Sequence, residues 1–127
     1  MHRLLRREGS VLLVEDEEPL RQAASKMLHK RGFFVIEAAD GSTALDAVRA
    51  QDIAIDILFL DVTLPGISSR VVLEEAKRLR PQVKVVVTSA YSKEMAAESL
   101  QTTIKHFLRK PYRLDDLVGF IQTNFPQ

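Results

Sequence analysis

Short apolar segments alternate five times with longer segments whose apolar residues recur at helical spacing along the 127-residue chain. The apolar segments are rich in valine, isoleucine, leucine and phenylalanine, which is typical of strands buried on both faces of a sheet. They lie at residues 11–14, 33–36, 57–60, 83–87 and 104–108. Strand–helix units in succession build a parallel sheet with helices on both faces. We therefore expect a single α/β domain with a doubly wound, five-stranded parallel sheet.

The intervening helices are indicated by spacing and by the residues at their ends. Pro19 suits the first turn of the first helix, and Asp40 precedes the second. Pro81 ends the third helix, because proline cannot continue the helical hydrogen bonds. Ser92 suits the N-cap of a fourth helix at 93–100. The first helix shows the apolar periodicity most clearly, at Leu20, Ala23, Ala24, Met27 and Leu28.

The composition excludes several classes of protein. The chain has no cysteine, which excludes a disulfide scaffold, a thiolate zinc site, a cysteine nucleophile and a dithiol redox motif. Its 18 basic and 17 acidic residues give a formal charge of +1, whereas a dedicated nucleic-acid-binding domain usually has a strong basic excess. The longest apolar run, residues 53–60, contains Asp56 and is far too short to span a bilayer. We expect a cytoplasmic domain that binds no nucleic acid and does not insert into a membrane.

The charge is unevenly placed along the chain. Residues 1–9 contain three arginines and one glutamate, and no strand or helix pattern begins among them. Chain termini of this kind are usually mobile and solvated. We therefore expect a flexible basic lead-in at 1–9, followed by one domain at 10–127.

Polar side chains stand at the carboxyl ends of four of the expected strands. In a doubly wound parallel sheet these ends meet at one edge, where ligands bind. Clustered carboxylates repel one another, and a hard divalent cation such as Mg²⁺ relieves the repulsion. A carboxylate beside magnesium, with a lysine and a hydroxyl nearby, suits phosphoryl transfer, because the cations neutralise the transferring group and the carboxylate can attack it. The residues at these ends are Glu15, Asp16, Asp61, Thr88 and Lys110.

The motifs around these residues resemble those of two-component receiver domains, the phosphoacceptor modules of response regulators and hybrid histidine kinases. The resemblance covers about residues 10 to 125, and its style is closer to the C-terminal receiver of hybrid sensor kinases. It implies a flavodoxin-like (βα)5 fold with strand order 2-1-3-4-5. In chain order, the motifs are VLLVEDEEPLR, ILFLDVTLPG, VVVTSAYS and FLRKPY.

The resemblance implies a role for each acid at the edge. Asp61 matches the phosphoacceptor aspartate. Glu15 and Asp16 match the acidic pair that, together with Asp61, holds Mg²⁺ or Mn²⁺. The backbone carbonyl of Thr63 matches a further metal ligand.

The remaining matched residues would bind the phosphoryl group or respond to it. Thr88 and Lys110 match the hydroxyl and the lysine that bind the phosphoryl oxygens. Phe107 matches the aromatic switch that moves with Thr88, although a phenylalanine there also suits plain core packing. Pro111 matches the family's cis proline.

Several positions depart from the common pattern, among them Ser89, where a smaller alanine or glycine is common. Phe107 replaces the frequent tyrosine and cannot donate a hydroxyl hydrogen bond. Ser69 stands where glycine is frequent, which affects the conformation of the loop after Asp61. Thr63 and Ala90 are neither acidic nor amide side chains, so we expect no strong activation of an attacking water and a slow loss of phosphate.

The function implied by the resemblance is acceptance of a phosphoryl group from the phosphohistidine of a histidine kinase or a histidine phosphotransfer domain. The receiver itself helps to catalyse this magnesium-dependent step and its own slow dephosphorylation, and it is not otherwise an enzyme. A downstream protein, or another domain of a parent hybrid kinase, would read the face formed by the fourth helix, fifth strand and fifth helix. A stand-alone receiver and an excised receiver of a hybrid kinase both fit.

Two other functions compete with this one. A pseudo-receiver would use the same fold as a protein-interaction module without phosphorylation, but such modules need not retain the complete set of strand-end residues found here. A flavin or nucleotide binder would use the same type of sheet. The first strand is followed by Glu-Asp-Glu-Glu-Pro, not by a glycine-rich phosphate loop, which disfavours this alternative.

Overall fold

Five strands and five helices alternate along the computed structural model, which describes residues 9–125. The lead-in expected at 1–9 therefore lies outside the described residues, apart from Gly9. The elements are β1 (Ser10–Val14), α1 (Glu18–Lys30), β2 (Phe34–Ala38), α2 (Gly41–Arg49), β3 (Ile57–Asp61), α3 (Ser69–Leu79), β4 (Lys84–Ser89), α4 (Lys93–Leu100), β5 (His106–Arg109) and α5 (Leu114–Asn124).

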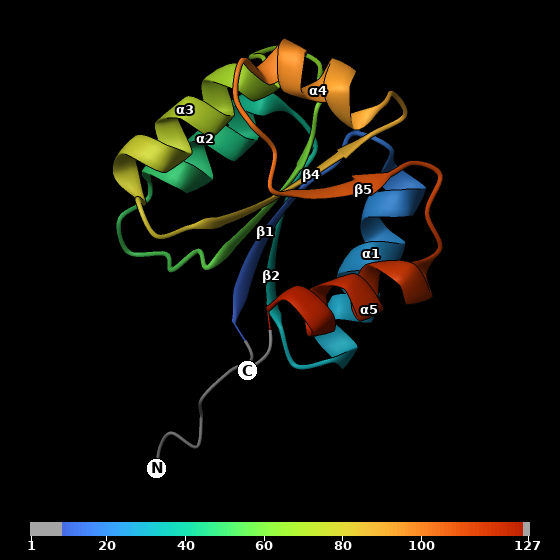
Figure 1. Cartoon of the computed structure of the whole chain (residues 1–127). Coiled ribbons are helices and arrows are strands. Elements are labelled where there is room, and N and C mark those ends of the chain that lie inside the picture. Colours follow the sequence, from blue (N-terminus) through green and yellow to red (C-terminus); the bar gives the residue numbers. More distant parts are fainter. Residues whose placement is uncertain (1–8, 126–127) are drawn as a thin grey trace.

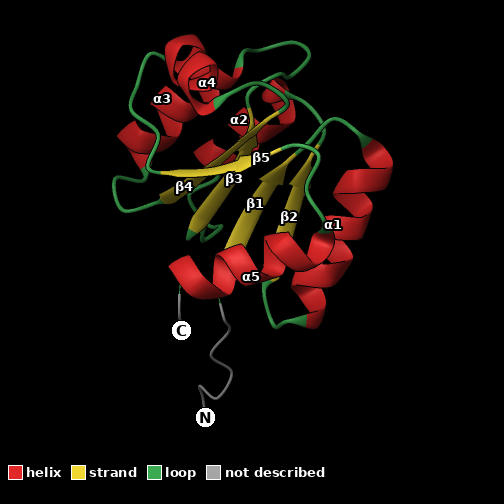
Figure 2. Cartoon of the chain, turned by 45° about the vertical axis from the view of Figure 1, so that its right-hand side comes forward, coloured by secondary structure: helices red, strands yellow, loops and turns green. Residues whose placement is uncertain are grey.

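The strands form one parallel sheet in the order β2-β1-β3-β4-β5. Helices α1 and α5 cover one face, and α2, α3 and α4 cover the other, as Figures 1 and 2 show. The sequence prediction of a doubly wound sheet with this strand order is confirmed. The carboxyl ends of all five strands consequently lie at the same edge of the sheet.

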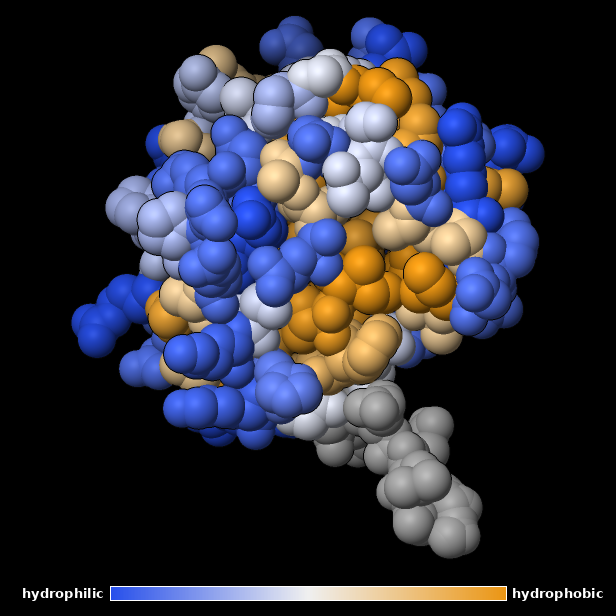
Figure 3. All heavy atoms as spheres, turned by 180° about the vertical axis from the view of Figure 1, so that it is seen from behind, coloured by the Kyte–Doolittle hydropathy of each residue, from blue (hydrophilic) through white to orange (hydrophobic). Residues whose placement is uncertain are grey.

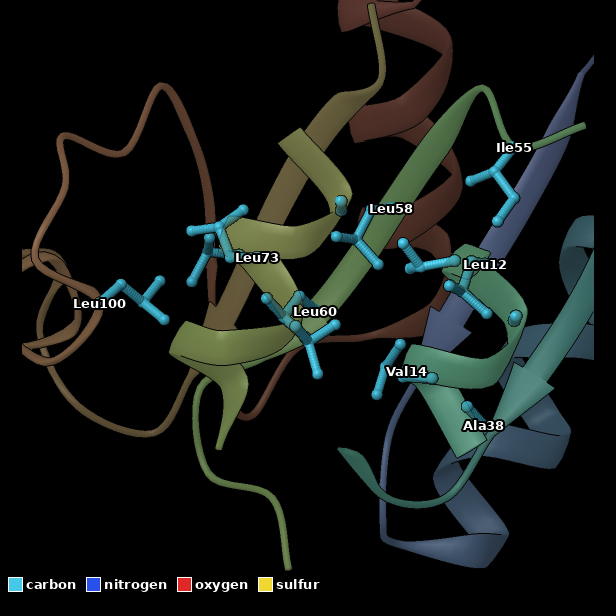
Figure 4. Packing of buried hydrophobic residues seen from close by; sticks show 14 of the residues in the cluster. Leu12, Val14, Ala38, Ile55, Leu58, Leu60, Leu73 and Leu100 are labelled. Carbon is cyan, nitrogen blue, oxygen red and sulfur yellow. The ribbon is translucent and has the colours of Figure 1, made fainter. Parts of the chain in front are cut away.

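The two central strands β1 and β3 are buried along their whole length, because helices cover both of their faces. Successive side chains point to opposite faces. Leu12 and Leu58 contribute to the core under α2, α3 and α4, together with Leu73 and Leu100 (Figure 4). Val11 and Phe59 belong to the separate core under α1 and α5. Each fully buried leucine contributes about 1.5–3 kcal/mol to folding.

The helix ends agree with the signals in the sequence. Asp40 caps α2 by accepting a hydrogen bond from the Thr43 amide, and Ser92 caps α4 in the same way through the Met95 amide. Pro19 lies in the first turn of α1. Side-chain caps satisfy amides that have no partner within the helix, so these residues set where each helix begins.

Gly41, the first residue of α2, is required by a close approach of two backbones. A Cβ atom at this position would lie 1.9 Å from the Ile67 carbonyl oxygen, and the Gly41 amide faces the Pro65 carbonyl at 3.4 Å. The start of α2 therefore packs directly on the loop between β3 and α3. This contact supports the loop that follows Asp61.

The observed strand bounds differ from the expected ones by one or two residues at each strand, most at β2, β4 and β5. β2 runs from residue 34 to 38, not 33 to 36, and β4 extends to Ser89. β5 begins at His106, two residues later than expected, because its pairing with β4 starts at the Val86–His106 pair. Ile104 instead packs into the core under α2, α3 and α4. Apolarity correctly indicated that Ile104 is buried, but this residue is buried in the core and not in the β4–β5 ladder.

Figure 3 shows hydrophilic side chains over most of one face, around a smaller area of apolar ones. None of the helices in the described part of the chain is both long enough and apolar enough to cross a bilayer.

Candidate functional site

The strand-end residues predicted from the sequence come together at the carboxyl edge of the sheet. Asp61 is the last residue of β3, and Thr88 lies beside it in the β3–β4 register. Glu15 and Asp16 follow β1, and Lys110 follows β5. Residues separated by up to 95 positions thus meet because the four strands are parallel neighbours.

Three carboxylates form the centre of this site. Glu15, Asp16 and Asp61 each place a carboxylate oxygen within 4.8 Å of the others. Glu15 and Asp61 are only 2% and 4% exposed, whereas Asp16 is exposed to solvent. Negative charges so close together, two of them away from water, repel one another strongly.

Lys110 is the cation that faces these acids. Its Nζ lies 2.8 Å from Glu15 Oε1, 2.8 Å from Asp61 Oδ2 and 3.5 Å from Glu17 Oε2. Burial by itself would lower the pKa of Lys110, but the hydrogen bonds to Asp61 and Glu15 outweigh it and raise this pKa above the ordinary value. Lys110 is therefore charged at neutral pH.

Glu15 is held in place although its environment disfavours its charge. Burial, and to a lesser degree the nearby charge of Asp61, raises the pKa of the Glu15 carboxyl. The Lys110 ammonium and the Glu17 amide, which donates to Glu15 Oε2 at 3.0 Å, act in the opposite direction. The single positive charge of Lys110 does not balance the negative charges of Glu15, Asp16 and Asp61. Binding of a further cation at this site would therefore be favourable.

Hydrogen bonds hold both carboxylate oxygens of Asp61 and its backbone carbonyl. Asp61 Oδ1 accepts from the Thr63 amide at 3.0 Å, and Oδ2 accepts from Lys110 Nζ. The Asp61 carbonyl accepts from the Ser69 hydroxyl at 2.5 Å. The carboxylate is therefore presented in one orientation at the end of β3.

Thr88 offers a hydroxyl group that has no hydrogen-bond partner among the described residues. The residue is 1% exposed, and its hydroxyl forms no hydrogen bond with any residue between 9 and 125. Its backbone carbonyl accepts from the Val62 amide at 3.0 Å, which ties β4 to the residue after Asp61. A buried hydroxyl without a partner is uncommon, and a ligand oxygen at this edge would supply one.

The backbone of Lys110 is hydrogen-bonded to the end of β4. The Lys110 amide donates to the Ser89 carbonyl at 2.8 Å, which extends the contact between β4 and β5 by one residue. The Lys110–Pro111 peptide bond is cis.

Phe107 is half-buried and packs against the core under α2, α3 and α4, next to Val87 in the register. Its role as a switch stays a prediction.

A hard divalent cation fits this group of residues. All the clustered ligand atoms are carboxylate oxygens, which Mg²⁺ and Mn²⁺ prefer. Asp16 is exposed, so a cation beside it could keep part of its water shell, as magnesium usually does. Thr63 contributes its backbone amide to Asp61, and its carbonyl as a metal ligand stays a prediction.

The structure adds two residues to the site that the sequence pattern did not place there. The pattern assigns Ser69 an effect on the conformation of the loop alone, yet its buried hydroxyl bonds directly to the Asp61 backbone. Tyr112 lies near the acids, and burial followed by the charge of Glu15 raises its pKa to about 12. For Ser69 the sequence does carry a signal, because it is a hydroxyl residue at the first position of a helix whose N-cap is Ser68.

Comparisons with known proteins agree with this arrangement. The family model of the response regulator receiver domain matches residues 11–122. The sensor kinase CckA of Brucella abortus is 34% identical over 115 residues, which are 90% of this chain and 12% of that kinase. The chemotaxis protein CheY of Bacillus subtilis is 28% identical over 113 residues, which are 87% of this chain and 92% of that protein.

A solved structure supports the same conclusion. The receiver domain of the hybrid histidine kinase CckA matches with a TM-score of 0.75 at 33% identity, over 91% of this chain and 97% of that one. The present chain spans 12% of the length of the Brucella abortus kinase, so the similarity concerns one module of that protein. The family match, the strand order and the acidic edge together show that the chain belongs to the response regulator receiver domains, which have a phosphoacceptor role in two-component signalling.

Proposed function

We propose that Asp61 accepts the phosphoryl group from a phosphohistidine of a histidine kinase or a histidine phosphotransfer domain. A carboxylate oxygen of Asp61 forms a bond to phosphorus while the bond between phosphorus and the histidine nitrogen breaks, and the electron pair of that bond stays on the imidazole. The observation that carries this proposal is the buried Asp61 carboxylate, oriented by Lys110 and the Thr63 amide within the acidic cluster.

The neighbouring side chains stabilise the charge of the transferring group. Lys110 is close enough to Asp61 to move its ammonium onto a phosphoryl oxygen once the acyl phosphate forms. The Thr88 hydroxyl, which has no hydrogen-bond partner within residues 9–125, would donate to another phosphoryl oxygen, and Thr88 is the register partner of Asp61. Both groups act by charge stabilisation and orientation, which supply most of the catalysis in phosphoryl transfer.

The metal would be held by Glu15, Asp16, Asp61 and the backbone carbonyl of Thr63. When bound, Mg²⁺ or Mn²⁺ supplies the positive charge that the transferring phosphoryl group needs and that Lys110 alone does not provide. The carboxylate cluster supports this assignment. In this proposal the domain accepts one phosphoryl group and loses it slowly, without turning over a separate substrate.

The output would pass through the face formed by α4, β5 and α5, in the cytoplasm. Two exposed apolar side chains support a protein contact at this face. Tyr91, just before α4, is 53% exposed, and Met95, in α4, is 55% exposed. Phe107 lies on β5, within the same face, and would change position with Thr88. The partner that binds this face would be a separate protein or another domain of a hybrid kinase.

Phosphotransfer from a radiolabelled phospho-histidine kinase, with and without Mg²⁺, tests the proposal. We expect label on the parent protein only with Mg²⁺, and none on the Asp61→Asn variant. Asp52→Asn, an exposed aspartate before β3, is the matched control and should accept label like the parent. Beryllofluoride should shift the amide resonances of the parent but not those of Asp61→Asn. A parent protein that neither accepts label nor binds beryllofluoride would be a pseudo-receiver.

A further inference from the structure

A hollow of about 380 Å³ lies at the end of the sheet opposite Asp61. It is bounded by the end of α3, the start of β4, the segment that leads into β5 and the end of α5. In Figure 1 these strands start on the side of the molecule away from the phosphoacceptor edge. Lys84, which lines the hollow, is four residues before Thr88, about 13 Å along β4.

The hollow exists because β5 is shorter than β4 at its beginning. Pairing of the two strands begins at Val86 and His106, so Lys84 and Val85 come before the first paired residue. Residues 102–105 line the hollow where a longer β5 would have continued. The accessible apolar surface of its floor comes from Val83 and Val85, which are half-buried. Buried side chains of both hydrophobic cores also line it: Leu73, Val87, Ile104 and Phe125.

The rim of the hollow is positively charged. Lys77, Lys84 and Lys105 line it, and none of the three takes part in an ion pair formed within residues 9–125. Lys77 Nζ donates to the hydroxyl of Thr102, another residue that lines the hollow, at 3.4 Å. Within the described part of the chain, no aspartate or glutamate lines the hollow.

The positive charges at the rim also act on His106, another residue that lines the hollow. Burial, followed by the charges of Lys105 and Lys84, lowers the pKa of its imidazole. These two lysines are therefore close enough to act on a group at the floor. An unneutralised cationic rim over an apolar floor is an arrangement that attracts anions and favours burial of an apolar group.

We propose that this hollow binds a small organic anion, in which an apolar body of one or two rings carries a sulfonate, phosphate or carboxylate group. The apolar body would occupy the floor, and the anionic group would lie between Lys84 and Lys105. The volume falls in the range of small-molecule sites, roughly 300–1,000 Å³. An inorganic anion would leave the apolar floor exposed to water, and a neutral ring would leave the lysines unpaired.

Three probes separate the contributions of charge and apolar surface: naphthalene-2-sulfonate, inorganic sulfate and the neutral 2-naphthalenemethanol. None of them donates a phosphoryl group, so Asp61 chemistry does not interfere. We expect naphthalene-2-sulfonate to bind at least about 10-fold more tightly than either other probe at low ionic strength, in an NMR titration. Saturable shifts should appear at the amides of residues 84–85 and 104–106, and binding should weaken as salt is raised.

Variants locate the site. Lys84→Gln and Lys105→Gln remove charge while keeping most of the side chain, and each is expected to weaken naphthalene-2-sulfonate binding about 5-fold. Lys93→Gln, an exposed lysine on α4 that does not line the hollow, should bind like the parent. Asp61→Asn should also bind like the parent, which separates this site from the phosphoryl site. The proposal would be overturned if a variant with both Lys84→Gln and Lys105→Gln bound naphthalene-2-sulfonate as tightly as the parent does. It would also be overturned if the parent bound the neutral 2-naphthalenemethanol as tightly as naphthalene-2-sulfonate.

Discussion

The Ser69 hydroxyl donates a hydrogen bond to the backbone carbonyl of Asp61, with 2.5 Å between the two oxygens. Ser69 is 2% exposed and begins α3, so the bond connects the start of this helix to the end of β3 beneath the acidic cluster. In the family a glycine is frequent at this position, and glycine cannot make the contact. This chain therefore supports the Asp61 backbone through a side chain of its own.

Ser69→Ala is expected to lower both stability and site affinity. Loss of the buried hydrogen bond should reduce the free energy of unfolding by about 1 kcal/mol. Because the bond supports Asp61, beryllofluoride binding should also weaken. Ser68→Ala is the matched control: it removes the N-cap of α3, at a similar cost of about 1 kcal/mol, without touching Asp61. Equal effects of the two variants on beryllofluoride affinity would show that Ser69 acts only through stability.

Thr88→Val tests the unpaired hydroxyl. Since that hydroxyl has no hydrogen bond within residues 9–125, the valine variant should unfold at the same denaturant concentration as the parent or at a higher one. Its affinity for beryllofluoride, measured by fluorescence or NMR titration, should fall about 10-fold, because one donor to the ligand is lost. Thr88→Ser should show the reverse pattern, with reduced stability and retained affinity. Loss of stability in Thr88→Val would contradict the assignment.

Asp16→Asn should weaken magnesium binding without affecting the metal-free protein. Asp16 is exposed and forms no ion pair in the described part of the chain, so its charge contributes little to folding. In the parent, saturating Mg²⁺ should raise the melting temperature through preferential binding to the folded state. The increase should be smaller in Asp16→Asn at the same Mg²⁺ concentration, with Asp52→Asn as the control. An unchanged Mg²⁺ response would remove Asp16 from the metal site.

His106 makes stability depend on pH in a defined direction. Burial and the charges of Lys105 and Lys84 lower its pKa in the folded protein from the ordinary value of 6.5. The unfolded chain therefore takes up a proton at higher pH than the folded one, and stability contributed by neutral His106 is lost as pH falls below about 6.5. His106→Phe keeps an aromatic ring beside Phe120 and Phe125.

We expect melting temperature to decline less steeply in His106→Phe than in the parent between about pH 7 and pH 5. His29→Gln, at an exposed position of α1, serves as the control and should retain the decline of the parent. Thermal unfolding followed by circular dichroism at half-unit pH steps is sufficient to compare the slopes. Parallel curves for parent and His106→Phe would assign the decline to the carboxylates.

Arg80 connects α3 to the end of α2. Its guanidinium donates to four backbone carbonyls, at distances of 2.7 to 3.4 Å, belonging to Ala47, Val48, Ala50 and Ile53. Arg80→Ala leaves these carbonyls without their donor and should lower the free energy of unfolding by about 2–3 kcal/mol. Lysine cannot reproduce the planar fork, so Arg80→Lys should recover little. Arg78→Ala, which removes only an exposed ion pair with Glu75, should cost less than about 1 kcal/mol.

Much of the fold could be predicted because its signals are local. Runs such as 11–14 and 57–60 are apolar on both sides, which requires coverage by helices on both faces, and N-caps such as Asp40 mark where helices begin. The strand ends could be predicted less closely. Ile104 has the apolar character of a strand residue, but the β4–β5 ladder begins two residues later, at the Val86–His106 pair, and Ile104 packs into the core under α2, α3 and α4.

By itself, the sequence determined the class of fold, the family and the set of residues at the carboxyl edge. These depend on local signals, namely the apolar runs that form strands and the polar residues that directly follow them. Only the tertiary structure decided which of those groups touch: Lys110 bonds to both Glu15 and Asp61, Ser69 supports the Asp61 backbone, and the Thr88 hydroxyl is left without a partner within residues 9–125. The same holds for the lysine-rimmed hollow, whose walls come from four elements. Periodicity reports which way a side chain faces, whereas contacts between elements depend on register and packing across the sheet.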